Sequence, residues 1–299
     1  MFSLLWKTVK VGVVTDDYPA QPAQLGERFR GRPDVDPALC DGCGSCAQVC
    51  PTRVISLARS ADQTPARLTI DLAGCIFCGE CAARCPRQAI RMTREYELAS
   101  RDRDRLVMEL DLCGTADCGA SDAAARPAPP AGPAGWPSLA AIGAVARERI
   151  GELFGRSLHI REVSAGCCNA CDCEASATTN PIFDIGRFGV HFVASPRYAD
   201  MLLVTGPVSR NMARPLVEAY NACPEPKLVL AVGACACSGG VFGASPQTMG
   251  GVDRVIPVNT YVPGCPPKPQ AIIHGILLTL EREKERFSKI RRVRAAAKG

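Results

Sequence analysis

Two cysteine runs of identical spacing constrain this chain more than any other feature of its sequence. The first is CDGCGSCAQVCP at residues 40–51, and the second is CIFCGECAARCP at residues 75–86. Both follow the pattern C-x2-C-x2-C-x3-C-P. Two-residue gaps let three thiolates converge on one metal centre, whereas the longer gap and the proline carry the fourth thiolate away from it. The two runs therefore predict two metal centres that exchange their fourth ligands.

This spacing resembles that of the bacterial two-cluster ferredoxins, which hold [4Fe–4S] clusters. The resemblance predicts one cluster on Cys40, Cys43, Cys46 and Cys85, and a second on Cys75, Cys78, Cys81 and Cys50. The alternative is a pair of zinc sites. Zinc sites usually combine two separated C-x2-C knuckles, not four cysteines in one run followed by proline. We therefore favour iron–sulfur clusters.

The total of 18 cysteines in 299 residues fits either a disulfide-rich secreted protein or a metal carrier. Lys7 and Lys10 interrupt the apolar N-terminal stretch, so we expect no export signal, and no run approaches the ~20 apolar residues of a membrane span. We therefore expect a cytoplasmic protein whose thiolates bind metal. A net charge of +5 and 5% aromatic residues give no support for nucleic-acid binding.

Composition divides the chain into five predicted regions. They are an N-terminal extension (1–30), a two-cluster domain (31–112), an Ala/Pro-rich linker (113–140), a second domain (141–286) and a basic tail (287–299). In the second domain, apolar runs at 158–163, 190–195, 201–206, 227–233 and 255–262 alternate with helix candidates near 174–186, 209–222 and 268–286. This alternation predicts an α/β domain with a mostly parallel sheet, preceded by a small α+β domain.

Most cysteines of the second domain follow the end of a predicted strand. The eight are Cys167, Cys168, Cys171, Cys173, Cys223, Cys235, Cys237 and Cys265. In open parallel sheets, binding sites lie outside the carboxyl ends of the strands. Three strand ends can thus bring thiolates together, which predicts a third metal centre.

Three motifs in this domain carry a family resemblance: GCCNACDCE (166–174), AVGACACSGG (231–240) and VPGCPPKP (262–269). They resemble the iron–sulfur subunit shared by [NiFe] hydrogenases and respiratory complex I, above all in membrane-bound hydrogenases of the formate hydrogenlyase type. The first domain resembles the two-cluster ferredoxin subunit of the same complexes. The resemblance implies a flavodoxin-like second domain with one [4Fe–4S] cluster beside a catalytic partner, and two subunits fused into one chain.

The resemblance also implies which thiols hold the third cluster. Hydrogenase members use C-x2-C followed by x2-Glu, whereas complex I members use adjacent cysteines followed by x2-Glu. Glu174 lies three residues after Cys171, which implies the hydrogenase register. The implied ligands are Cys168, Cys171, Cys235 and Cys265.

The remaining cysteines are expected to be structural, although Cys167, Cys173 and Cys237 stay alternative ligands of the third centre. Cys223 precedes a turn, and Cys113 and Cys118 form a C-x4-C without further ligands. Glu174 has two interpretations that we weigh equally. It caps or pairs near the start of the following helix, or, as the hydrogenase resemblance allows, it relays protons to the active site of a partner.

The sequence contains no Rossmann fingerprint, P-loop or nucleophile–base motif, so we expect this chain to transfer electrons while a partner performs the reaction. The leading prediction is a three-cluster subunit of a membrane-bound [NiFe] hydrogenase, peripheral on the inner face of the membrane. Expected partners are a large-subunit-like catalytic chain, membrane subunits and an electron-donating iron–sulfur or formate dehydrogenase-type subunit. The alternatives are the corresponding subunit of a complex I-like NADH/quinone oxidoreductase, a nickel-lacking relative, or an iron–sulfur redox sensor.

Overall fold

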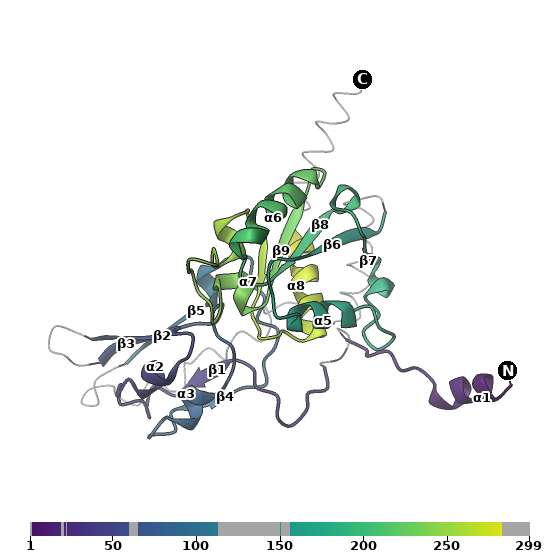
Figure 1. The fold of residues 1–299 in the computed structure, drawn as a ribbon. Coiled ribbons are helices and arrows are strands. Elements are labelled where there is room, and N and C mark those ends of the chain that lie inside the picture. Colours follow the sequence, from purple (N-terminus) through teal and green to yellow (C-terminus); the bar gives the residue numbers. More distant parts are fainter. Residues whose placement is uncertain are drawn as a thin grey trace.

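The computed structural model describes residues 2–18, 21, 23–59, 65–112, 150 and 156–282. Within them, a small cysteine-rich body packs beside a parallel sheet that is covered by helices (Figure 1). The predicted linker with Cys113 and Cys118, and the basic tail, lie outside the described residues.

The first body is built from short antiparallel strands and two short helices. β1 (Pro33–Val35) pairs with β4 (Ile90–Met92), and β2 (Ile55–Arg59), β3 (Pro65–Asp71) and β5 (Val107–Asp111) form a second sheet, preceded at β5 by a 3-10 turn, η1 (Asp104–Leu106). The helices are α2 (Ser45–Val49) and α3 (Glu80–Ala83). They start after Gly44 and Gly79, whose φ angles of 78° and 82° favour glycine. The sequence repeat is therefore also a structural repeat.

The second body contains a five-stranded sheet that is parallel throughout, as predicted. Its strands are β6 (Leu158–Ser164), β7 (Val190–Phe192), β8 (Met201–Thr205), β9 (Leu228–Val232) and β10 (Thr260–Val262). The spatial order is β10-β9-β8-β6-β7. Counted along the domain this is 2-1-3-4-5, the strand order of flavodoxin. The order reverses between β6 and β8, whose register runs from Ile160–Met201 to Ser164–Thr205.

Helices cover both faces of this sheet, and all residues of β8 and β9 are buried. The helices are α5 (Ala170–Ala177), α6 (Arg210–Ala222), α7 (Ala234–Ser238) and α8 (Pro269–Arg282), with 3-10 turns η2 (Ile185–Phe188), η3 (Pro196–Tyr198) and η4 (Val252–Arg254). α5 and α8 contribute to the core on one face. α6 and α7 contribute to the core on the other face, which continues into the first body.

Three predicted elements of the second domain differ from the structure, and one helix was not predicted. The strand expected at 190–195 ends at Phe192. The strand expected at 255–262 is confined to β10, because Pro257 lacks the N–H that a paired strand must donate. The helix expected near 174–186 begins four residues earlier, at Ala170, and ends before Pro181, which disfavours helix in the preceding residue. The short helix α7 was not predicted.

The two bodies share backbone hydrogen bonds as well as a core. Ser100 and Tyr261 exchange both of their backbone hydrogen bonds, at 2.9 and 2.7 Å. The hydroxyl of Ser238 on α7 donates to the carbonyl of Ala73, at 3.3 Å. These contacts tie the loop that carries the second cysteine run to the sheet of the second body.

Part of the predicted N-terminal extension also packs against the second body. Tyr18 is only 2% exposed and belongs to the core beneath α8, and its hydroxyl donates to Glu97. In contrast, α1 (Phe2–Val11) lies at the end of an arm that leaves the body, with Trp6 and Val9 exposed (Figure 1). None of the helices that the structure describes is long and apolar enough to cross a membrane.

The packing of α8 gives a test of this fold. Gly275 faces the sheet so closely that an added Cβ would lie 2.3 Å from a methyl group of Val262. We expect Gly275→Ala to destabilise the fold by roughly 1–3 kcal/mol, as overpacked cores do. Thermal unfolding measures the effect, with Gly26→Ala as the control because that position has no neighbour within 4 Å. Equal midpoints for the two variants would contradict this packing.

Candidate metal centres

The four thiols predicted for the first cluster line one small cavity. They are Cys40, Cys43, Cys46 and Cys85. Three come from the first run and one from the end of the second, so the structure brings together the four thiols that the predicted exchange of fourth ligands requires. Leu57, Leu68 and Ile90 complete the wall and give the cavity an apolar lining.

The thiols predicted for the second cluster also gather across the two runs. Burial raises the pKa of Cys75 to about 12, and the neighbouring thiols that add to this effect are Cys81, Cys50 and Cys78. Cys50 comes from the first run, so this group, too, combines thiols of both runs, as the predicted exchange requires. Only thiolates bind iron, so these cysteines must release protons when a cluster is bound.

The third group forms where β6, β9 and β10 end. Cys168 and Cys171 lie on the loop after β6 and the first turn of α5, Cys235 lies on α7, and Cys265 follows β10. Burial raises the pKa of Cys171 well above its ordinary value, and the nearby thiols that contribute are Cys235, Cys265, Cys168 and Cys167. Cys168 and Cys265 are exposed, so this group opens onto the surface.

Two glycines, Gly233 and Gly240, make room for the thiols of the third group. At Gly233, with φ of 93°, a Cβ would lie 2.5 Å from the sulfur of Cys171. At Gly240, with φ of 53°, a Cβ would lie 3.0 Å from the sulfur of Cys235. Within the described ranges, no three Cys, His, Asp or Glu side chains form a group suited to a single metal ion. Only glycine leaves room for these two sulfur atoms, which fits a site that holds several thiolates close together.

Three of the cysteines expected to be structural have partners other than metal. Cys223 is buried and its thiol donates to the carbonyl of Ala199, at 2.9 Å. Cys237 is buried, and its thiol lies 3.6 Å from the carbonyl of Ala231. Cys167 contacts the carboxylate of Asp172 on α5. Cys173 is exposed.

The structure contains a partly buried polar network that the sequence did not predict, and Thr205 is its fully buried member. The hydroxyl of Thr205, the last residue of β8, donates to Oδ1 of Asp172 at 2.5 Å, and the thiol of Cys167 lies 2.8 Å from Oδ2. Burial opposes the ionisation of Asp172, but hydrogen bonds from Cys167, Thr205, Ser164 and Glu162 together lower its pKa below the ordinary value. The sequence signal for this network is Glu162, because it is an acidic residue inside the strand predicted at 158–163.

Glu174 lies in the second turn of α5, because that helix begins at Ala170. Its interpretation as a cap at the start of the helix is therefore wrong. Burial raises the pKa of Glu174, and the charge of Lys268 opposes the shift. Glu174 also lines an open pocket together with Asp16 and Gln270.

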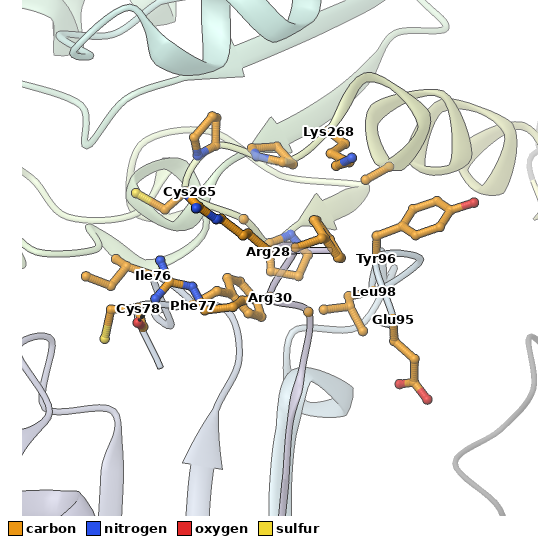
Figure 2. A pocket seen from close by; sticks show the side chains of 17 residues that line it. Arg28, Arg30, Ile76, Phe77, Cys78, Glu95, Tyr96, Leu98, Cys265 and Lys268 are labelled. Carbon is orange, nitrogen blue, oxygen red and sulfur yellow. Dashed lines mark hydrogen bonds between the residues drawn. The ribbon is translucent and has the colours of Figure 1, made fainter. Parts of the chain in front are cut away.

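A pocket of about 420 Å³ separates the second and third thiol groups (Figure 2). Cys78 lies on one wall with Ile76 and Phe77, and Cys265 lies on the other wall. Arg30 enters from the N-terminal side, and its guanidinium donates to the carbonyl of Cys78 at 2.5 Å. The second thiol group is therefore the one that faces the third.

The polar network predicts a carboxyl group that titrates near neutral pH. Burial raises the pKa of Glu162 to about 7, and the charge of Asp172 contributes. We expect infrared spectra to show a protonated carboxyl band that disappears as the pH rises through about 7. The band should be absent in Glu162→Gln and unchanged in Glu109→Gln, an exposed glutamate on β5. A band that persists in Glu162→Gln would contradict the assignment.

Two families of known sequences match this chain. The family described as "NADH ubiquinone oxidoreductase, 20 Kd subunit" matches residues 168–279. The family described as "4Fe-4S dicluster domain" matches residues 39–89, which hold both cysteine runs.

Similar proteins come from both hydrogenases and NADH-quinone oxidoreductases. The chain is 49% identical over 138 residues to the probable membrane-bound hydrogenase subunit mbhJ of Pyrococcus furiosus, covering 45% of this chain and 83% of that protein. It is 45% identical over 125 residues to formate hydrogenlyase subunit 7 of Escherichia coli, covering 42% of this chain and 49% of that protein. It is 43% identical over 141 residues to an NADH-quinone oxidoreductase subunit of Roseiflexus sp., covering 46% of this chain and 52% of that protein.

The similarity to the Pyrococcus protein extends over most of that protein. The region matched by the 20 Kd subunit family contains the third thiol group. The resemblance inferred from the cysteine motifs is thus confirmed. This chain belongs to the family of the 20 Kd subunit of NADH ubiquinone oxidoreductase, and carries a 4Fe-4S dicluster domain ahead of it.

Proposed function

We propose that this chain is an electron-transfer subunit with three [4Fe–4S] clusters in a membrane-bound [NiFe] hydrogenase of the formate hydrogenlyase type. The observation that carries the proposal is the gathering of the twelve predicted ligand thiols at three places, from segments that are distant in the sequence. At the third place Cys167 is a fifth neighbouring thiol. Bound clusters supply reversible one-electron chemistry, and the protein sets their spacing and surroundings.

The three groups follow one another in space, as an electron-transfer subunit requires. Cys46 of the first group and Cys81 of the second are close enough for their charges to interact. Cys78 of the second group and Cys265 of the third line the same pocket. The third group opens to the surface through Cys168 and Cys265. A catalytic partner would therefore bind next to the third group, while an electron-donating subunit would bind near the first.

The hydrogenase assignment rests on the register of the third group. Cys171 points toward Cys235, and Glu174 follows three residues later on the same helix, which matches the C-x2-C arrangement implied by the resemblance. The second candidate is a complex I-like oxidoreductase. It is favoured by Cys167, which lies close enough to Cys171 and Cys235 for its charge to raise the pKa of both thiols.

Two further parts of the proposal concern the fold of the second domain and the place of the chain in a larger complex. We infer a flavodoxin-like domain, since the strand order and the loop after β6 place the thiols at the reversal point of the sheet. We further propose membrane subunits as partners, on the inner face of the membrane. The exposed Trp6 and Val9 of α1 provide an apolar surface for such contacts.

Metal analysis of the complex tests the proposed function. After anaerobic purification through a tag on this chain, we expect about 12 iron atoms per chain from its three cubanes, in addition to the iron of the partners. We also expect nickel in the co-purifying catalytic subunit. Nickel should be absent when the complex is isolated from cells grown without it. A complete complex that lacks nickel although the cells were supplied with it would exclude the hydrogenase assignment and favour the complex I-like candidate.

Alanine substitutions test the ligand set of the third group. Cys168→Ala and Cys171→Ala should each remove the third cluster, with loss of about four iron atoms per chain, because three thiolates hold a cubane poorly. Cys173→Ala and Cys223→Ala are matched controls that should keep it. Electron paramagnetic resonance of the reduced chain distinguishes the clusters. If the signal of the third cluster were lost in Cys167→Ala and kept in Cys168→Ala, the ligand would be Cys167 and not Cys168.

A further inference from the structure

Asp172 connects the loop of the third thiol group to both strands at the reversal point of the sheet. It lies in the first turn of α5, directly after Cys171. Its Oδ1 accepts a hydrogen bond from Thr205, the fully buried last residue of β8. Its other partners include Ser164, the last residue of β6, and Glu162 from the same strand. One carboxylate thus fixes the position of α5 relative to β6 and β8.

The same carboxylate holds the first of the two adjacent cysteines. The sulfur of Cys167 lies 2.8 Å from Oδ2 of Asp172 and 3.2 Å from the hydroxyl of Ser164. The backbone N–H of Asn169 donates to the same sulfur at 3.1 Å. The side-chain oxygen of Asn169 lies 3.6 Å from this sulfur, so the Cys167 side chain is held by four contacts.

Cys167 is nevertheless close to the site. Its charge raises the pKa of Cys171 and of Cys235, two members of the third group. Cys168 is exposed on the same loop and also influences both of these thiols. Two adjacent sulfurs are thus candidates for one ligand position. To bind iron, the Cys167 side chain would have to give up its contacts with Asp172, Ser164 and Asn169, and losing a hydrogen bond is unfavourable for a partly buried carboxylate.

We propose that Asp172 is a positioning residue that selects Cys168, and not Cys167, as a ligand of the third cluster. The inference rests on the proposed third cluster. By keeping the Cys167 side chain turned toward β6 and β8, the carboxylate leaves Cys168 as the sulfur that can reach the site. In this chain an adjacent cysteine pair is thereby made to act as a C-x2-C motif.

A suppressor experiment on the full-length chain tests this role. In Cys168→Ala, Asp172 still holds Cys167, and we expect the third cluster to be lost. In Cys168→Ala/Asp172→Ala, Cys167 is released and replaces the missing ligand. We expect at least half of the lost iron to return, with a paramagnetic resonance spectrum that differs from the wild type. Adding Cys167→Ala to this double variant should remove the cluster again.

Matched variants separate selection from a general effect of mutation. Cys168→Ala/Glu162→Gln and Cys168→Ala/Thr205→Val alter neighbours of Asp172 but keep its contact with Cys167, so neither should recover the cluster. If Asp172→Ala alone lacks the third cluster, Asp172→Asn in the Cys168→Ala background replaces it as the test, and recovery is again expected.

Three results would overturn the proposal. The first is a Cys168→Ala chain that keeps the cluster through Cys167 while Asp172 is intact. The second is recovery in the two control variants to the same extent as with Asp172→Ala. The third is failure to recover with both Asp172 substitutions. Failure of the proposed function itself would look different, because the wild-type chain would then lack a third cluster in the same spectra.

Discussion

The structure depends on one geometric requirement, which is that four sulfur atoms from separate segments must meet around each cluster. In the first body this requirement links the two runs to each other, since Cys85 joins the first group and Cys50 joins the second. In the second body it links the ends of three strands. Neither group of the first body can be complete unless both runs are folded together. Cluster binding and folding should therefore be coupled in this chain.

The packing between the two bodies determines how the groups follow one another. The contact of Ser238 with Ala73 holds the segment before the second run against α7, and the paired backbone hydrogen bonds of Ser100 with Tyr261 hold a segment after that run against β10. As a result, Cys78 faces Cys265 across one pocket (Figure 2). The fusion of two kinds of domain in one chain is thus accompanied by a shared core, which gives a fixed separation between the second and third groups.

The sequence allowed some parts of this arrangement to be predicted, for physical reasons. The ligand exchange in the first body follows from local spacing, and the central strands β8 and β9 are continuous apolar runs. Other parts depend on tertiary contacts that no local pattern encodes. The register of Cys167 depends on Asp172, whose partners Thr205 and Ser164 come from different strands. The short helix α7 has no apolar periodicity of its own, and the burial of Tyr18 depends on a distant glutamate, Glu97.

The central claim is that the second body holds a cubane cluster of its own, assembled from three strand ends. Mössbauer spectroscopy of the full-length chain labelled with iron-57 tests it most directly when wild type is compared with Cys235→Ala. The account predicts that all wild-type iron belongs to [4Fe–4S] clusters, and that Cys235→Ala loses about one third of it while the remaining spectrum is unchanged. Equal iron content in the two proteins, or loss of iron from all clusters at once, would contradict it.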